Sequence, residues 1–219
     1  MRKIIFVSLL SLSAAAAAES PPPPGLMVSE TVKSLAALVS DCRLPLAADP
    51  VALRGIVDHH LRPKADVLYA GQLILGRHWP DANPDQRRRF AEALYGTLVN
   101  RYTTGLLLLT ARNVAVVPPG ATPDGSEAVV ELRVDAGLAT PIPIFLQMRL
   151  GSGRWRVYDA RWEDQSYVLS LRHEFSLAIR RDGLEAVIRR LEASAGTPAG
   201  PPEARDTMAG RCLRARAAR

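Results

Sequence analysis

The sequence has few residues of the types that build metal and redox sites. It contains two cysteines, Cys42 and Cys212, and four histidines. There is no C-x-x-C pair, and neither cysteine has a metal-binding partner at the usual spacing. His59 and His60 are adjacent on a predicted helix, so their side chains point about 100° apart. This favours a solvated surface, and the sequence predicts no metal and no bound cofactor.

The short motifs of common enzymes are also missing. No G-x-S-x-G occurs, and no glycine-rich phosphate cradle follows a predicted strand. Asp159 and Glu163 would lie roughly 13 Å apart along one strand, whereas paired glycosidase carboxylates lie about 5 to 10 Å apart. We expect Asp159 to hydrogen-bond nearby backbone and Asp164 to cap the following helix. His173 has no oriented nucleophile beside it, and the sequence predicts a protein that is not an enzyme.

Excess positive charge is confined to the ends of the chain. The net charge is +6, of which Arg2 and Lys3 contribute +2 and residues 193–219 contribute +3, so residues 19–192 carry +1. So little excess charge does not suit a nucleic-acid backbone, and we expect no nucleic-acid partner. After the N-terminal segment, no stretch is both long enough and sufficiently free of charge to cross a membrane.

The N-terminus has the form of an export signal. Arg2 and Lys3 precede a mostly apolar run at residues 4–12, and small residues follow up to Ala18. The uncharged run is shorter than the roughly 20 residues of a membrane span, which favours cleavage after Ala18. An exported protein meets an oxidising compartment. There Cys42 and Cys212 could form a disulfide or Cys42 could stay unpaired, and the sequence favours neither.

Proline and glycine divide the rest of the chain. We expect a signal peptide at residues 1–18, a proline-rich linker at 19–27, a folded domain at 28–192 and a disordered basic tail at 193–219. The tail has scattered arginines and little apolar periodicity. Its removal is therefore expected to leave folding intact.

The sequence pattern of the domain predicts helices first, then strands, then helices again. Asp49-Pro50 is a helix start, and residues 83–86 resemble a capping box. Predicted helices cover residues 28–41, 50–61, 64–77, 84–109, 165–181 and 184–191. Period-two segments with short connections lie at residues 114–117, 128–135, 142–148 and 154–162. They predict a four-stranded antiparallel sheet and an α+β fold.

Two predicted apolar faces are suited to an interior surface. The long helix repeats apolar residues every three or four positions at Phe90, Leu94, Leu98, Tyr102, Leu106 and Leu109. The third strand places Ile142, Ile144, Leu146 and Met148 on one face. Periodicity does not distinguish a filled core from a cavity, so both interpretations stay open.

Three stretches, taken in order, resemble a known family. They are L-R-G-I-V-D at 53–58 with Y-A-G-Q-L-I-L-G at 69–76, N-P-D-Q-R at 83–87, and W-R-V-Y-D at 155–159. Their order and spacing resemble the MlaC family of periplasmic phospholipid-binding proteins, also called the toluene-tolerance family. The resemblance covers residues 28–192. Many members have Glu-Gly-Val-Ser before the late helix, where this sequence has E-D-Q-S at 163–166, so that turn lacks its glycine.

The resemblance implies a periplasmic carrier that uses no cofactor. It would ferry phospholipid between an outer-membrane lipoprotein–porin complex and an inner-membrane ABC transporter, and so maintain outer-membrane lipid asymmetry. The acyl chains would lie in an apolar cavity enclosed by the sheet and the C-terminal helices. The expected lining residues are Leu73, Leu98, Tyr102, Leu106, Ile142, Ile144, Leu146 and Phe175. Two alternatives stay open, a small periplasmic enzyme on a cone-shaped α+β fold and a carrier of another apolar lipid such as a hopanoid.

Overall fold

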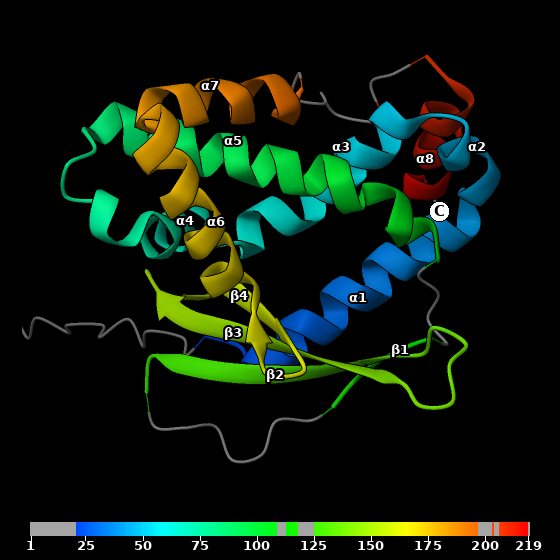
Figure 1. Cartoon of the computed structure of the whole chain (residues 1–219). Coiled ribbons are helices and arrows are strands. Elements are labelled where there is room, and N and C mark those ends of the chain that lie inside the picture. The colour runs from blue at the N-terminus through cyan, green and yellow to red at the C-terminus, as the bar shows by residue number, and fades with distance from the viewer. Residues whose placement is uncertain (1–20, 109–112, 118–124, 197–202, 204–205, 219) are drawn as a thin grey trace, which may run out of the picture.

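The computed structural model describes residues 21–108, 113–117, 125–196, 203 and 206–218, and it has an α+β fold (Figure 1). The α-helices are α1 (Pro24–Asp41), α2 (Arg43–Ala47), α3 (Pro50–Leu61), α4 (Val67–Leu75), α5 (Pro84–Tyr102), α6 (Tyr167–Asp182), α7 (Leu184–Ala195) and α8 (Met208–Ala217). Three short 3-10 helices are η1 (Arg62–Lys64), η2 (Gly76–His78) and η3 (Thr103–Leu108). The strands are β1 (Val114–Val116), β2 (Glu127–Val134), β3 (Ile142–Gly151), β4 (Arg154–Trp162) and β5 (Gln165–Ser166).

Side-chain caps fix where the helices begin. The Asp49 carboxylate accepts a hydrogen bond from the backbone N–H of Ala52 at 2.9 Å, as the Asp-Pro pair predicts. The predicted capping box of α5 is confirmed, since Asn83 and Gln86 each accept from the other's backbone N–H. Each cap satisfies donors that the first helical turn leaves without a partner.

The start of α6 differs from the prediction. Asp164 was expected to cap this helix, but the Ser166 hydroxyl accepts from the backbone N–H of Leu169 at 3.0 Å. The role expected of Asp159 is confirmed, because its carboxylate accepts from the backbone N–H of Val168 at 2.9 Å and from the Ser166 hydroxyl at 2.5 Å. The helix therefore begins two residues later, after an extra short strand.

The sheet is an antiparallel meander in the order β1-β2-β3-β4-β5. Four strands were expected, and the fifth, β5, adds only two residues to the edge of β4. The register pairs Leu132 with Ile144 and Leu146 with Ala160. Since side chains alternate along a strand, these residues share one face, and Figure 1 shows the helices stacked above it.

Two apolar clusters join the layers. One cluster lies among the helices α4, α5, α6 and α7, and includes Phe90, Leu94, Phe175, Ile188 and Leu191. The other joins α1 to the sheet through Val28, Val130, Met148 and Trp155. Figure 1 shows α1 lying between the sheet and the upper helices.

The C-terminal segment packs on the domain, so the expected disordered tail is wrong where the structure describes it. Helix α8 buries Ala209 and Leu213 in a third cluster with residues of α1, α2 and α3. A disulfide joins Cys42 to Cys212. Two buried apolar residues give little periodicity, but the covalent bond holds them in place. At the other end, α1 begins at Pro24, within the expected linker.

The expected signal peptide lies outside the described residues. Among the helices that the structure describes, none is both long and apolar enough to cross a bilayer.

Candidate functional site

A cavity of about 350 Å³ lies between α1 and the covered face of the sheet. We call it the central cavity. Its apolar wall includes Val28, Val32, Leu35, Leu132, Leu146 and Val157. The cavity arises because α1 and the sheet each turn an apolar face toward the other and do not fill the space between them.

A smaller cavity of about 160 Å³ continues under α4 and α5. We call it the α5 cavity. It shares Ala65, Tyr95 and Val157 with the central cavity, so the two are neighbours. Leu98 lines it, as the helical periodicity predicts for an interior position.

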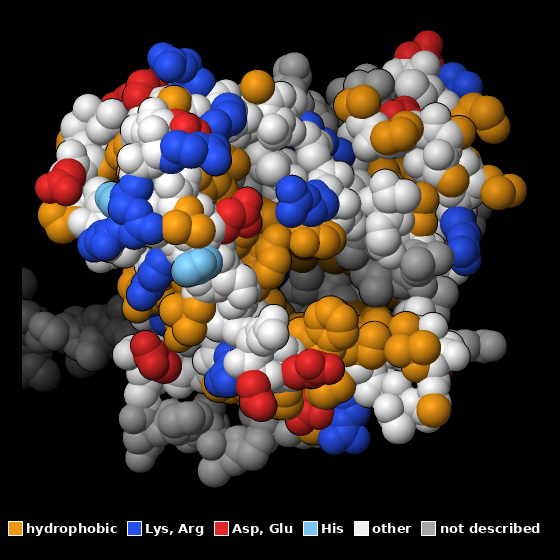
Figure 2. Space-filling model, in the orientation of Figure 1, with side chains coloured by type: hydrophobic (Ala, Val, Ile, Leu, Met, Phe, Trp, Pro, Cys, Tyr) orange, Lys and Arg blue, Asp and Glu red, His pale blue; other side chains and the backbone are white. Residues whose placement is uncertain are grey.

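The third cavity, of about 720 Å³, lies at the end of the sheet beside the start of α6. We call it the mouth cavity. The structure brings three of the predicted residues together here, Tyr102, Ile142 and Ile144. Trp162 and Tyr167 also line it, so that three aromatic side chains, with Tyr102, surround this cavity. Figure 2 shows hydrophobic side chains gathered along the line where the helical layer meets the sheet.

Two tyrosines from different helices meet at the mouth cavity. The hydroxyls of Tyr102 and Tyr167 lie 3.0 Å apart, and their rings are in edge contact with centroids 6.2 Å apart. Burial, and then the hydrogen bond to Tyr102, raises the pKa of Tyr167 to about 12. Tyr102 itself is 52% exposed. It therefore lies at the rim of the mouth cavity.

The central cavity has few polar residues. The Thr31 hydroxyl donates to the carbonyl of Met27 at 2.7 Å, and Lys64 Nζ donates to the carbonyl of His60 at 3.0 Å. The Tyr95 hydroxyl is buried, and burial together with the neighbouring carboxylate of Asp58 raises the pKa of Tyr95. The other residues that line the central cavity are apolar.

An ion pair fixes the sheet against the start of α4. Asp66 is 6% exposed, and its carboxylate accepts from Arg149 Nε at 2.6 Å and from the backbone N–H of Tyr69 at 3.3 Å. The Arg149 guanidinium lies 3.9 Å from the centroid of the Tyr69 ring. The backbone N–H of Asp66 donates to the carbonyl of Val157, a lining residue, at 2.8 Å. This network holds one wall of the cavities in place.

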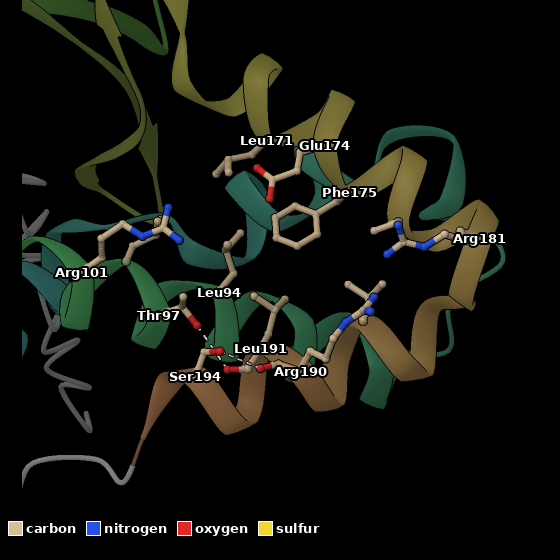
Figure 3. A pocket seen from close by; sticks show the side chains of 13 residues that line it. Leu94, Thr97, Arg101, Leu171, Glu174, Phe175, Arg181, Arg190, Leu191 and Ser194 are labelled. Atoms are coloured by element: carbon tan, nitrogen blue, oxygen red, sulfur yellow. Dashed lines mark hydrogen bonds between the residues drawn. The ribbon is translucent and has the colours of Figure 1, made fainter.

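The remaining predicted lining residues are dispersed. Leu146 lines the central cavity, and Leu73 packs against the helical cluster. Phe175 lines a separate groove of about 290 Å³ between α5, α6 and α7 (Figure 3). The side chain of Leu106 lies outside the described residues. The role of all eight in lipid binding stays a prediction.

Comparison with known proteins identifies the family. The profile of the MlaC protein family matches residues 29–193. The chain belongs to the MlaC family. A relative from Haemophilus influenzae, the intermembrane phospholipid transport system binding protein MlaC, is 24% identical over 153 residues, which are 68% of this chain and 72% of that protein.

A solved structure shares the MlaC fold. It is the phospholipid-binding protein from Ralstonia solanacearum in complex with a phospholipid, with a TM-score of 0.59 and 24% identity. The match covers 78% of this chain and 98% of that chain. The resemblance predicted from the sequence motifs is thereby confirmed at the level of family and fold.

Several lining residues of this MlaC-family chain escaped the sequence reasoning. Val28, Val32 and Leu35 line the central cavity from α1, and their three- and four-residue spacing was a usable signal. Trp162 and Tyr167 were missed as well. Their lining role depends on the β4–β5 turn, for which periodicity gave no indication. No group of three or more potential metal ligands occurs among the residues that the structure describes.

Proposed function

We propose that this chain is a carrier that holds a phospholipid with its acyl chains in the central and α5 cavities. The main observation behind this proposal is the apolar lining of the central cavity, with Leu132, Leu146 and Val157 on one side and α1 on the other. Membership of the MlaC family supports the same conclusion. The relatives named above bind or transport phospholipid according to their descriptions.

Physical chemistry explains why such a cargo needs an enclosed site. A lipid with two acyl chains exposes about thirty methylenes, and moving them into water costs on the order of 20 kcal/mol at ~0.8 kcal/mol each. A dry cavity removes most of that barrier. The lining offers an acyl chain apolar partners, and the few polar groups of the central cavity are engaged with backbone or buried. That arrangement favours binding over acid–base catalysis.

We further propose that the carrier works in the periplasm and exchanges its lipid with two membrane complexes. One is an outer-membrane lipoprotein–porin complex, and the other is an inner-membrane ABC transporter. The support is the family and the N-terminal segment with its basic start, apolar run and small residues. Energy for directed transport would come from the ABC transporter.

A charge placed in the cavity tests the proposal. Leu146 lines the central cavity from β3, and a carboxylate beside an acyl chain would be poorly solvated. We expect Leu146→Glu protein from the periplasm, purified without detergent, to hold at least tenfold less phospholipid per chain than wild type. Phosphorus analysis of an organic extract measures this amount.

Val129 provides the matched control. It is 48% exposed and lies on the opposite face of the sheet from Val130 and Leu132. Val129→Glu should keep its lipid. Circular dichroism must show that both variants are folded. A folded Leu146→Glu variant with wild-type lipid content would contradict the proposed cargo site.

A further inference from the structure

The β4–β5 turn has an unusual residue at the rim of the mouth cavity. Trp162 pairs with Gln165, so Glu163 and Asp164 form a two-residue hairpin loop. Glu163 has φ +53°, the left-handed region in which glycine is favoured. Two-residue hairpin loops need this conformation, and Ser152 of the β3–β4 loop also has it, with φ +50°. A glutamate in this position is nevertheless uncommon.

The surroundings of Glu163 suit a small organic cation. Glu163 lines the mouth cavity together with Trp162, Tyr102 and Tyr167. Trp162 is 59% exposed, and its ring is accessible at the rim. Exposed aromatic faces and a carboxylate are the groups that bind ammonium ions. No ion pair engages Glu163 within the described part of the chain.

The opposite side of the same rim suits a phosphate. One of the Tyr102 and Tyr167 hydroxyls donates to the other, which leaves the second proton free to donate outward. Arg161 also lines the mouth cavity. A donor pair and a guanidinium can bind phosphodiester oxygens. In Figure 2, acidic side chains border a group of hydrophobic ones over the sheet.

We propose that Glu163 and Trp162 bind the ammonium of a zwitterionic phospholipid headgroup, while its phosphate faces the tyrosine pair. The inference rests on the proposed carrier function and adds headgroup selection to it. The carboxylate of Glu163 binds an ammonium-bearing headgroup, whereas a headgroup that carries only negative charge offers Glu163 no cationic partner. This role would explain why a glutamate occupies a turn position that favours glycine and why it lies beside the cavity.

The test compares bound lipid with the membrane that supplied it. Wild type, Glu163→Gln, Glu163→Gly and Asp164→Asn are expressed with the signal segment in one host and purified without detergent. Mass spectrometry gives the ratio of phosphatidylethanolamine to phosphatidylglycerol in each protein extract and in the host membranes. Asp164 is the control, since it is the other carboxylate of the same turn and is exposed. Melting temperatures check that every variant is folded.

We expect wild type to enrich the ammonium-bearing lipid by about threefold to tenfold over the membrane ratio, as one exposed ion pair and one cation–π contact allow. Glu163→Gln and Glu163→Gly should reduce the enrichment to about one, and Asp164→Asn should keep it. Glu163→Gly should melt no lower than wild type, because the turn then has its preferred residue. Equal ratios in wild-type extract and membrane, or enrichment that survives in Glu163→Gln, would overturn headgroup selection alone. Folded wild type with no phospholipid would overturn the carrier function itself.

Discussion

Removing the Cys42–Cys212 disulfide should cost this domain a large part of its stability. The two cysteines are 170 residues apart. A cross-link over a loop of that length lowers the entropy of the unfolded chain by an amount equivalent to about 5 kcal/mol at 25 °C, and measured losses for native disulfides are typically about 2 to 5 kcal/mol. We therefore expect the Cys42→Ala/Cys212→Ala variant to lose about 3 to 5 kcal/mol.

The experiment is urea unfolding followed by circular dichroism, without reductant, for four proteins. They are wild type, the double cysteine variant, Leu213→Ala, and the triple combination. Leu213 is 3% exposed on α8, so its truncation should cost about 2 to 5 kcal/mol while α8 is docked. If the disulfide keeps α8 docked, Leu213→Ala should cost much less in the double cysteine background.

Two results would refute this reasoning. Equal free energies of unfolding for wild type and the double cysteine variant would mean that the cross-link does not constrain the unfolded chain as assumed. Equal costs of Leu213→Ala in both backgrounds would mean that α8 stays packed without its covalent bond. The second result would leave the docked helix intact and remove the disulfide from the explanation of its position.

Other predictions follow from single contacts near the cavities. Asp66→Asn removes the charge of a buried carboxylate that pairs with the partly exposed Arg149, and should cost about 1 to 3 kcal/mol, measured by urea unfolding. An unchanged free energy of unfolding would contradict the proposed anchoring of α4. Gly71→Ala would place a Cβ 2.8 Å from a side-chain carbon of α5 and should cost about 1 to 3 kcal/mol, whereas Gly105→Ala, with open space around it, should be nearly neutral. The pKa of Tyr167, raised to about 12, exceeds the value of about 10 in an unfolded chain, so its contribution to stability is present below pH ~10 and is lost as the pH rises to ~12. Tyr102→Phe should lower that pKa in an ultraviolet titration, and an unchanged titration would contradict the hydrogen bond.

The helices and strands could be predicted where local chemistry decides them. Asp49-Pro50 and the capping box at Asn83 fixed two helix starts, and the change of apolar period located the sheet. The start of α6 was missed because residues 163–166 all have polar side chains, and Asp164 and Ser166 can both cap a helix. Which of them does so depends on the short pairing of β5 with β4.

Long-range features could not be predicted from local patterns. The docked helix α8 is bonded to Cys42 through Cys212, and sequence spacing alone allowed that bond without requiring it. Likewise, the apolar positions of β3 face both cavity and core. Leu146 lines the central cavity, whereas Met148, two residues later, is fully buried. Alternation gives the face of the sheet, and only the packing of α1 determines which part of that face stays open.

The most direct test of the carrier function is native mass spectrometry of wild-type protein, purified from the periplasm without detergent. The central and α5 cavities should retain acyl chains through chromatography, because release into water is costly. We predict a main species whose extra mass equals one phospholipid per chain, and a phospholipid of that mass in an organic extract. Folded protein that shows only the mass of the bare chain, with no lipid in the extract, would contradict the account.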